Sequence, residues 1–272
     1  MIAGNCTPAI ADVEQLIVGG ARVARLSIEQ TAALMVNLAR AAVLERSPLY
    51  LTSVNGEVLA RRYRSPAFAE LLDSADLISA DGQPLVIASR LLLGNGLPER
   101  VATTDLYWVV ARVAQEQRVS FYLFGAEEEM NRRACDMTRN QFPRLDICGR
   151  SHGYLEGDAL EKKINEINAL APDILWLALG VPREQEFVRA HRAQLPNVKI
   201  IKTSGGLFDF VAGARSRAPL WMQKCGLEWA YRLALEPRRL LVRYLTTNPV
   251  ALMLLLTRTR REDRRDTQPK DA

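Results

Sequence analysis

Residues 119–141 read VSFYLFGAEEEMNRRACDMTRNQ, and they contain one complete change from strand to helix. The first six residues are mostly apolar or aromatic, which is typical of a short buried strand. Gly125 ends that run, and residues 127–141 show the mixed polar and apolar spacing of a helix. The stretch therefore predicts a strand followed by a helix, which is the repeating unit of a parallel sheet.

The same unit recurs along the chain. Further short apolar strands are predicted at YLTSV (50–54), LIS (77–79), DILWLAL (173–179) and KIIKT (199–203). Further helices are predicted from Ser27 to about Arg46, where Ser27 and Gln30 form a capping-box pattern, from Ser65 to Ser74, and after Pro182. We expect an α/β fold with a Rossmann-like, mainly parallel sheet and helices on both faces, formed by residues 1–214.

Basic charge is concentrated near the C-terminus. The 272 residues carry a net charge of +5, and residues 215–265 hold twelve Lys or Arg against four Asp or Glu. On a helix that advances about 100° per residue, Arg232, Arg239 and Arg243 fall within about 40° of one another. Pro237 is expected to bend or restart that helix, because proline lacks a backbone donor. The sequence thus predicts a basic helical appendage over residues 215–257, with an anionic partner.

The end of the chain holds an apolar run and a charged tail. The run VALMLLL (250–256) is far shorter than the ~20 residues that span a bilayer. Two interpretations stay open for it: it rests on an anionic membrane surface, or it packs on the core or on a partner subunit. Residues 258–272 are expected to form a disordered tail.

The cysteines and the N-terminus bear on the compartment. Cys6, Cys135, Cys148 and Cys225 are scattered without a CxxC pair, so neither a zinc site nor disulfides are indicated. The first fifteen residues, MIAGNCTPAIADVEQ, lack the basic region and apolar core of a signal peptide. These features favour a cytoplasmic location of the protein.

Four predicted strands end in polar or glycine-rich turns, SVNGE, FGAEEE, LGVPREQE and TSGGLFDF. In open parallel sheets, ligands bind outside the carboxyl ends of the strands. Each turn taken alone is also compatible with an ordinary loop between strand and helix. Because four such ends meet at one edge of the sheet, a binding cleft is the favoured interpretation.

Several ligand classes have no motif in this chain. There is no GxGxxG after a strand, no GxxxxGK[ST] loop and no GxSxG motif, which argues against dinucleotide binding, ATP or GTP hydrolysis and a serine hydrolase. There is also no Asp-x-Asp to hold a divalent metal against a diphosphate. Protein cations or helix N-termini would then have to balance a diphosphate, and the three arginines are suited to that role.

The motifs of the chain resemble those of one family. They are SVNGEVL (53–59), FAELLDSADLISADGQPLVIASRLL (68–92), PERVATTDL (98–106), FYLFGA (121–126), PDILWLALGVPREQE (172–186), GGLFDFVAGARSRAPLWMQKCGLEWAYRL (205–233) and EPRRLLVRY (236–244). Together, in this order, they resemble the WecG/TagA/CpsF family of bacterial glycosyltransferases.

The resemblance implies an activity and its partners. It implies inverting, metal-independent transfer of a sugar from a UDP-sugar to a polyprenyl-diphosphate-linked saccharide, in envelope or exopolysaccharide synthesis. The sugar would be a hexose such as glucose, or of the N-acetylmannosamine type. No cofactor is expected, and the enzyme would be peripheral on the inner face of the cytoplasmic membrane. Whether it forms a homo-oligomer stays open.

The resemblance also assigns roles to residues of the core. Asp81 matches the proposed catalytic aspartate, and an inverting displacement independently requires such a base. Asn55 would bind the substrate or orient Asp81, and Ser53 stands where the family often has threonine. Arg100 and Gln185 match pocket residues. The alternatives are a turn-forming Asp81-Gly82, a surface ion pair of Arg100 with Glu99 or Asp105, and a Gln185 that simply lies in the first turn of a helix.

The remaining assignments concern glycines and the appendage. Gly125, Gly180, Gly205 and Gly206 would let the backbone approach the nucleotide, or else end strands in turns. Asp209 lies in a segment that the resemblance places at the lip of the donor site. Residues 215–257 would close over the site as a lid, with Arg232, Arg239 and Arg243 on the diphosphate and Arg238 as a fourth candidate. Trp221, Trp229 and Tyr231 would pack between domains or rest at a lipid interface.

Two other classes of function are weaker. The basic C-terminal region alone would suit a non-catalytic nucleic-acid-binding module, but RRM, KH and zinc-finger motifs are absent, so no nucleic acid is expected. A soluble nucleotide-sugar-modifying enzyme, such as an epimerase, would use a similar sheet. The missing dinucleotide motif argues against it.

Overall fold

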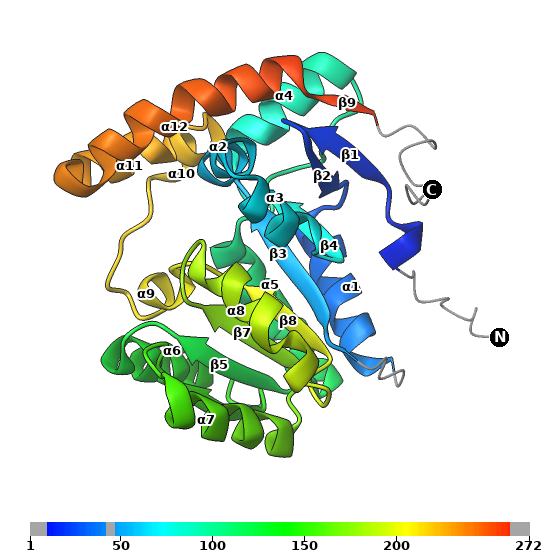
Figure 1. Ribbon diagram of the computed structural model, residues 1–272, viewed down its shortest axis with the longest axis vertical. Helices are drawn as coiled ribbons and strands as arrows, with labels where there is room; N and C mark the ends of the chain where they lie inside the picture. The colour runs from blue at the N-terminus through cyan, green and yellow to red at the C-terminus, as the bar shows by residue number, and fades with distance from the viewer. Residues whose placement is uncertain (1–9, 42–46, 262–272) are drawn as a thin grey trace.

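A six-stranded, all-parallel sheet forms the centre of the protein (Figure 1). The computed structural model describes residues 10–41 and 47–261. The strands are β3 (Leu49–Val54), β4 (Leu77–Ala80), β5 (Phe121–Gly125), β6 (Ile147–Ser151), β7 (Ile174–Ala178) and β8 (Ile200–Thr203), and their order across the sheet is β4-β3-β8-β7-β5-β6. The predicted parallel sheet is confirmed.

Helices cover both faces of the sheet, as predicted. On one face, Phe121 and Leu123 of β5 pack with α1 (Ile28–Arg40), α5 (Thr103–Gln117), α6 (Glu128–Gln141) and α9 (Leu207–Val211). On the other, Tyr122 and Phe124 pack with α7 (Gly157–Leu170) and α8 (Arg183–His191), which the short 3₁₀ helix η2 (Arg192–Gln194) follows. Alternate residues of one strand thus enter opposite cores, because successive side chains of a strand point to opposite faces.

A third core lies beside the β3–β4 edge. It joins α2 (Gly56–Arg64), α3 (Pro66–Asp73) and α4 (Gln83–Leu93) with a small antiparallel sheet of order β2-β1-β9. A 3₁₀ helix, η1 (Ile10–Asp12), precedes β1 (Gln15–Val18), and Gly19 and Gly20 turn the chain into β2 (Ala21–Ala24). Both glycines have positive φ, which a two-residue hairpin turn requires. Neither this hairpin nor the edge strand β6 was predicted from the sequence.

Local sequence explains where several helices begin and end. Ser27 and Gln30 form the predicted capping box at the start of α1, which ends at Arg40 rather than near Arg46. Residues 42–46 lie outside the described residues. Asn55 caps α2, since its Oδ1 accepts from the backbone N–H of Val58 at 3.2 Å. The capped start of α2 places Asn55 at the carboxyl end of β3, where the cleft was expected.

The basic appendage forms three helices, α10 (Leu220–Lys224), α11 (Glu228–Leu235) and α12 (Pro237–Thr257). Between α9 and α10 the chain runs along one side of the molecule, from beside the parallel sheet to the end where α11 and α12 lie (Figure 1). Helix α11 ends at Leu235 and α12 restarts at Pro237, so the predicted interruption is confirmed. After α12, Arg260–Arg261 form β9 and pair with β1. The prediction of disorder from residue 258 was therefore wrong for 258–261, and residues 262–272 lie outside the described residues.

Helix α12 is longer and more apolar than the run VALMLLL indicated. By length and composition it is the one described helix that could cross a membrane, with a mean hydropathy of 1.4 over its most apolar window. One face packs against α2 and buries Leu240, Tyr244, Thr247, Ala251, Leu254 and Leu255. The opposite side exposes Leu241, Val242, Leu245, Leu252, Met253 and Leu256. The helix thus packs on the core with one face and leaves a second apolar side exposed.

Candidate functional site

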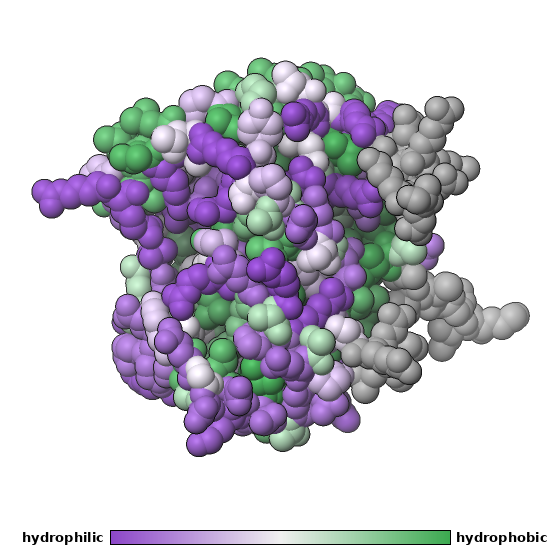
Figure 2. Space-filling model, in the orientation of Figure 1, coloured by the Kyte–Doolittle hydropathy of each residue, from purple (hydrophilic) through white to green (hydrophobic). Residues whose placement is uncertain are grey.

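A large cavity lies at the carboxyl ends of the parallel strands. Its volume is about 1350 Å³, and residues that follow β3, β4, β5, β6, β7 and β8 line it together with the appendage. Figure 2 shows apolar surface gathered over α11, α12 and α4 at the upper end, with more polar surface below it. The strands β3 and β8 are neighbours in the sheet, but the helices that follow them lie on opposite faces. Helix α3, which comes after β3, contacts α8 on one face. Helix α9, which comes after β8, packs in the core on the other face. Helices that leave adjacent strands toward opposite faces open a crevice between them.

Asp81 lies in this cavity directly after β4. Its backbone N–H donates to Val54 O at 2.8 Å, and its Oδ2 accepts from Thr103 Oγ1 at 3.3 Å. Arg100 Nε lies 3.9 Å from Asp81 Oδ1. Burial raises the pKa of Asp81 above its ordinary value, while the positive charges of Arg100 and Lys202 oppose that increase and Glu228 adds to it. A carboxylate with a raised pKa in a cavity is suited to exchange protons with a ligand.

Ser53 and Asn55 lie on the same wall, at the end of β3, and both line the cavity. Ser53 Oγ lies 3.2 Å from Thr103 Oγ1. Asn55 uses its carbonyl oxygen to cap α2, which leaves its amide nitrogen as the group that can donate to a ligand. The predicted neighbours Ser53, Asn55 and Asp81 are thus brought together.

Lys202 is a residue of the site that the sequence analysis missed. Its side chain is 1% exposed, and its Nζ donates to Ser53 Oγ at 2.8 Å and to Thr203 O at 3.0 Å. Burial lowers the pKa of Lys202 to about 8, although the carboxylates of Asp81 and Glu184 oppose this change. The signal was a lysine within the apolar strand KIIKT, since buried lysines are rare unless paired.

Glu184, rather than Gln185, lines the cavity at the start of α8. Its Oε2 accepts from the backbone N–H of Gly205 at 2.8 Å and of Ser204 at 3.3 Å. Burial raises the pKa of Glu184, and those two backbone donors and Lys202 oppose the increase. Gln185 is buried beside it and donates to Glu184 Oε1 at 3.3 Å. Gln185 is therefore not among the cavity residues, and its alternative position in the first turn of the helix is the observed one.

The predicted glycines divide into two kinds. Gly180, Gly205 and Gly206 line the cavity, and a Cβ on Gly180 or Gly205 would meet nothing within 4 Å. Gly125 does not line it. A Cβ on Gly125 would come within 2.2 Å of Ala178 O, so this glycine allows β5 to approach β7 rather than a ligand. Asp209 lines the cavity and pairs with Arg215 at 3.0 Å.

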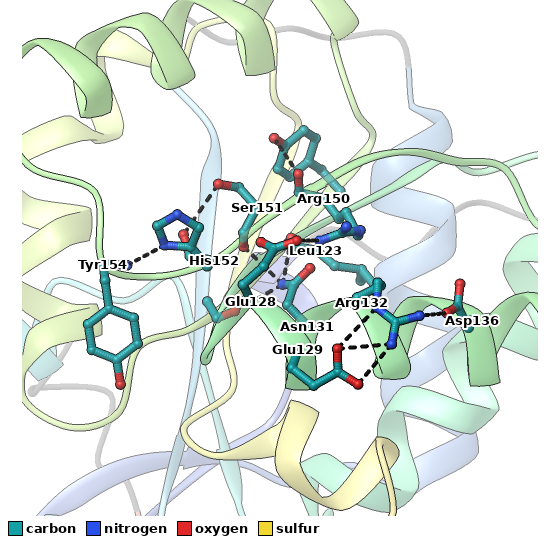
Figure 3. Close-up of polar contacts among 12 residues, drawn as sticks. Leu123, Glu128, Glu129, Asn131, Arg132, Asp136, Arg150, Ser151, His152 and Tyr154 are labelled. Carbon is teal, nitrogen blue, oxygen red and sulfur yellow. Dashed lines mark hydrogen bonds and ion pairs between the residues drawn. The ribbon is translucent and has the colours of Figure 1, made fainter.

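One side wall of the cavity is held by the corner between β5, α6 and β6 (Figure 3). The buried Asn131 donates to the carbonyl oxygens of Leu123, Gly125 and Ser151, which ties the ends of β5 and β6 together. Tyr154 follows β6, and its backbone N–H donates to His152 Nδ1 at 3.2 Å. The guanidinium of Arg183 lies 5.6 Å from the Tyr154 ring centroid, and both side chains line the cavity. An aromatic ring and a cation at this wall are suited to a flat, anionic ligand.

The arginines of the appendage face the cavity from the opposite side. Arg232, Arg239 and Arg243 all line it, whereas Arg238 does not. Arg239 Nε lies 2.5 Å from Glu236 Oε2, and Arg243 Nη1 lies 3.3 Å from Glu57 Oε2. The Arg232 guanidinium lies 5.7 Å from the ring centroid of Phe210. Residues more than 150 positions after Asp81 thus bring three cations to the cavity that contains it.

Contacts between the appendage and the core differ from the expected ones. Arg100 pairs with Glu228 of α11, and not with Glu99 or Asp105 as the alternative interpretation proposed. Trp229 packs edge-on against Tyr244 at 5.9 Å between ring centroids, and Tyr231 Oη lies 3.1 Å from Ser216 Oγ. Trp221 is 62% exposed, so it has no packing role in the core. Within residues 10–41 and 47–261, no group of three or more His, Cys, Asp or Glu side chains is placed to hold a metal ion.

Comparison with known proteins gives one consistent result. The model of the glycosyl transferase WecG/TagA/CpsF family matches residues 16–265. An N-acetylglucosaminyldiphosphoundecaprenol N-acetyl-beta-D-mannosaminyltransferase of Bacillus subtilis (strain 168) is 32% identical over 189 residues, which cover 70% of this chain and 72% of the relative. A protein of the same name from Staphylococcus aureus (strain MRSA252) is 27% identical over 192 residues, covering 71% and 74%. The region that matches the family contains all the cavity residues described above.

Proposed function

Because the chain belongs to the WecG/TagA/CpsF family of glycosyl transferases, we propose that it transfers a sugar from a UDP-sugar to a polyprenyl-diphosphate-linked saccharide. Its relatives are named for transfer to N-acetylglucosaminyldiphosphoundecaprenol, which supports this class of acceptor. The observation that carries the proposal is one cavity that contains both the carboxylate of Asp81 and three arginines of the appendage.

Asp81 acts as the general base of an inverting displacement. It accepts the proton of the acceptor hydroxyl while that oxygen forms a bond to the anomeric carbon of the donor. The bond from that carbon to the phosphate oxygen breaks at the same time, and its electron pair leaves with UDP. The raised pKa of Asp81 supports this role, because a base is most effective when its pKa approaches the working pH.

The arginines bind the diphosphate, and no metal is required. Arg232, Arg239 and Arg243 face the cavity with guanidinium groups, which form strong charge-assisted hydrogen bonds to phosphate. They would stabilise the charge that develops on UDP as it leaves. Tyr154, which follows β6, and Arg183, which begins α8, are positioned to contact the nucleoside part of the donor.

The protein acts at the inner face of the cytoplasmic membrane, where a polyprenyl-linked acceptor is available for envelope or exopolysaccharide synthesis. On α12, Leu241, Leu245, Leu252 and Leu256 are exposed and fall within about 60° of one another around the helix. Trp221 of α10 and Leu91 of α4 are also exposed and apolar. An apolar stripe beside basic side chains supports binding to an anionic membrane surface, with α12 lying along it.

The decisive experiment measures UDP release from UDP-N-acetylmannosamine and, for comparison, UDP-glucose, with and without a short-chain prenyl-diphosphate-linked N-acetylglucosamine. We expect release that requires the acceptor and that persists in EDTA. Release or donor modification without acceptor would instead favour a soluble nucleotide-sugar-modifying enzyme. Loss of activity in EDTA that Mn²⁺ restores would contradict the metal-free mechanism.

A further inference from the structure

Beside the proposed base, a partly buried chain of hydrogen bonds runs from Lys202 to Asp81. Lys202 Nζ donates to Ser53 Oγ at 2.8 Å, Ser53 Oγ lies 3.2 Å from Thr103 Oγ1, and Thr103 Oγ1 lies 3.3 Å from Asp81 Oδ2. The four residues come from β8, β3, the start of α5 and the loop after β4. Because residues from three separate strand ends contribute to it, this chain of hydrogen bonds exists only in the folded sheet.

The two ends of this chain determine its direction. An ammonium group can only donate hydrogen bonds, and an ionised carboxylate can only accept them. Ser53 accepts from Lys202, so its own hydroxyl hydrogen is available to Thr103, and Thr103 in turn donates to Asp81. Every link therefore points from the lysine toward the carboxylate, which is the arrangement that suits Asp81 in its ionised form.

The surroundings of Lys202 and Asp81 leave this lysine without another evident task. Lys202 does not line the cavity, and its remaining hydrogen bond goes to the backbone oxygen of Thr203. The charged groups that act on it are Asp81 and Glu184, and those that act on Asp81 are Arg100, Lys202 and Glu228. Burying an ammonium group is costly unless its charge and its donors are used.

We propose that Lys202 is a positioning residue for the reaction: through Ser53 and Thr103 it holds the Asp81 carboxylate ionised and oriented toward the acceptor hydroxyl. This inference rests on the proposed function, since it assumes that Asp81 is the base. It extends that function by assigning roles to Lys202 and Thr103, and it gives Ser53 a role in the chain in place of direct contact with the donor.

The test measures the titration of Asp81 directly, without turnover. The side-chain carboxyl carbon of Asp81 is followed by NMR in ¹³C-labelled protein, with the signal assigned by its loss in Asp81→Asn. In Lys202→Met, loss of the nearby positive charge should move the midpoint upward by about one pH unit or more. The acid limb of the kcat/KM profile should move with it, and kcat should fall while KM for the UDP-sugar changes little.

Two further variants keep the test conclusive. If Lys202→Met does not fold, Ser53→Ala can replace it, because it breaks the chain of hydrogen bonds but keeps the charges of Lys202 and Asp81. It should move the titration midpoint of Asp81 in the same direction, by a smaller amount. Ser53→Thr keeps the hydroxyl and should return the midpoint to the wild-type value. The matched control is Thr52→Val, which removes the neighbouring buried hydroxyl that bonds to Thr203 at 2.7 Å and should leave the midpoint in place.

The outcomes separate the two proposals. If Asp81→Asn retains turnover, the proposed base is wrong whatever the titrations show. If turnover requires Asp81 but a folded Lys202→Met leaves the midpoint and the acid limb unchanged, only the role of Lys202 is overturned. An equal shift in Thr52→Val would also overturn it, because the effect would then come from general loosening of the sheet.

Discussion

Arg100 Nη1 lies 2.5 Å from Glu228 Oε2, although the two residues are 128 positions apart in the chain. Arg100 belongs to the loop before α5, and Glu228 begins α11 of the appendage. Both side chains are largely buried, and Arg100 Nε also lies 3.9 Å from Asp81 Oδ1. This ion pair ties the appendage to the core directly beside the proposed base.

Glu228→Gln should therefore loosen the appendage. A hydrogen bond to a charged group contributes about 1.5–3 kcal/mol, so the loss of charge should speed amide exchange in α11 by roughly tenfold or more. Hydrogen exchange of residues 228–235 measures this effect. Glu236→Gln is the control, because Glu236 forms its ion pair with Arg239 inside the appendage. Unchanged exchange in α11 would show that other contacts hold the appendage.

Asp81→Asn should abolish most turnover and yet stabilise the fold at neutral pH. Removing a general base costs about 10²–10⁴-fold in rate. The folded pKa of Asp81 is raised above its unfolded value, so the stability linked to this group is present below the unfolded pKa and is lost as pH rises through the folded pKa. The uncharged asparagine avoids that loss.

Unfolding in urea at several pH values checks the sign. The gain in stability of Asp81→Asn over the wild type should be present at pH 7 and should vanish as pH falls toward about 4, where aspartate protonates in the unfolded chain. A variant less stable than the wild type at pH 7 would contradict the raised pKa. Near-normal turnover would contradict the role as base.

Arg239→Ala and Arg243→Ala should each weaken catalysis, whereas Arg238→Ala should not. Arg238 is the neighbour of Arg239 and also carries a positive charge, but it does not line the cavity. A charge-assisted hydrogen bond is worth about 1.5–3 kcal/mol, which corresponds to roughly a tenfold to hundredfold loss in kcat/KM. Steady-state kinetics with UDP-sugar measure it. Equal losses in all three variants would point to general electrostatic attraction instead.

Polar substitution of the exposed stripe should release the protein from membranes without unfolding it. Leu245→Gln with Leu252→Gln changes two exposed side chains of α12 that also line the cavity, so vesicle sedimentation rather than turnover is measured, and we expect it to weaken with anionic vesicles. Cutting the chain after Leu245 is a less suitable test, because it also removes Leu254 and Leu255 from the core. Arg112→Ala, which removes an exposed ion pair with Glu29, is the control. Unchanged vesicle binding would mean that this stripe does not contact lipid.

Gly125→Ala and Gly180→Ala should differ strongly in stability. Both glycines have positive φ, which costs an alanine about 1–2 kcal/mol. At Gly125 the added Cβ would also collide with the backbone of Ala178, whereas at Gly180 it meets nothing within 4 Å. Thermal unfolding should therefore show a far larger loss for Gly125→Ala. Similar losses would contradict the packing role of Gly125.

Local patterns predicted most of the core elements. Strands such as β5 and β7 are short apolar runs ended by glycine, and the cap of α1 depends on two residues three positions apart. The hairpin of β1 and β2 was missed, although Gly19-Gly20 is a recognisable turn. The edge strand β6 was missed because its sequence, ICGRS, is half polar, as an edge strand allows.

The candidate site was predicted only in part. Sequence motifs identified Asp81, Asn55 and the appendage arginines, and the structure places them around one cavity. For Gly125 and Gln185 the structure shows the alternative interpretations: Gly125 ends β5 close to Ala178, and Gln185 lies in the first turn of α8, where the adjacent Glu184 faces the cavity. One position around a helix start decides which side chain points inward, and a sequence pattern does not resolve that difference.

By itself, the sequence determined five of the six strands of the parallel sheet, the location of the basic region and the membership of the family, because these depend on residues close together in the chain or on the order of motifs. The partners of the charged groups were decided only by the tertiary structure. Lys202 reaches Ser53 because β8 and β3 pair in parallel, and Arg100 reaches Glu228 because α11 returns over the sheet edge. Such partners, far apart in sequence, meet only when packing fixes the strand order and places the appendage against the core.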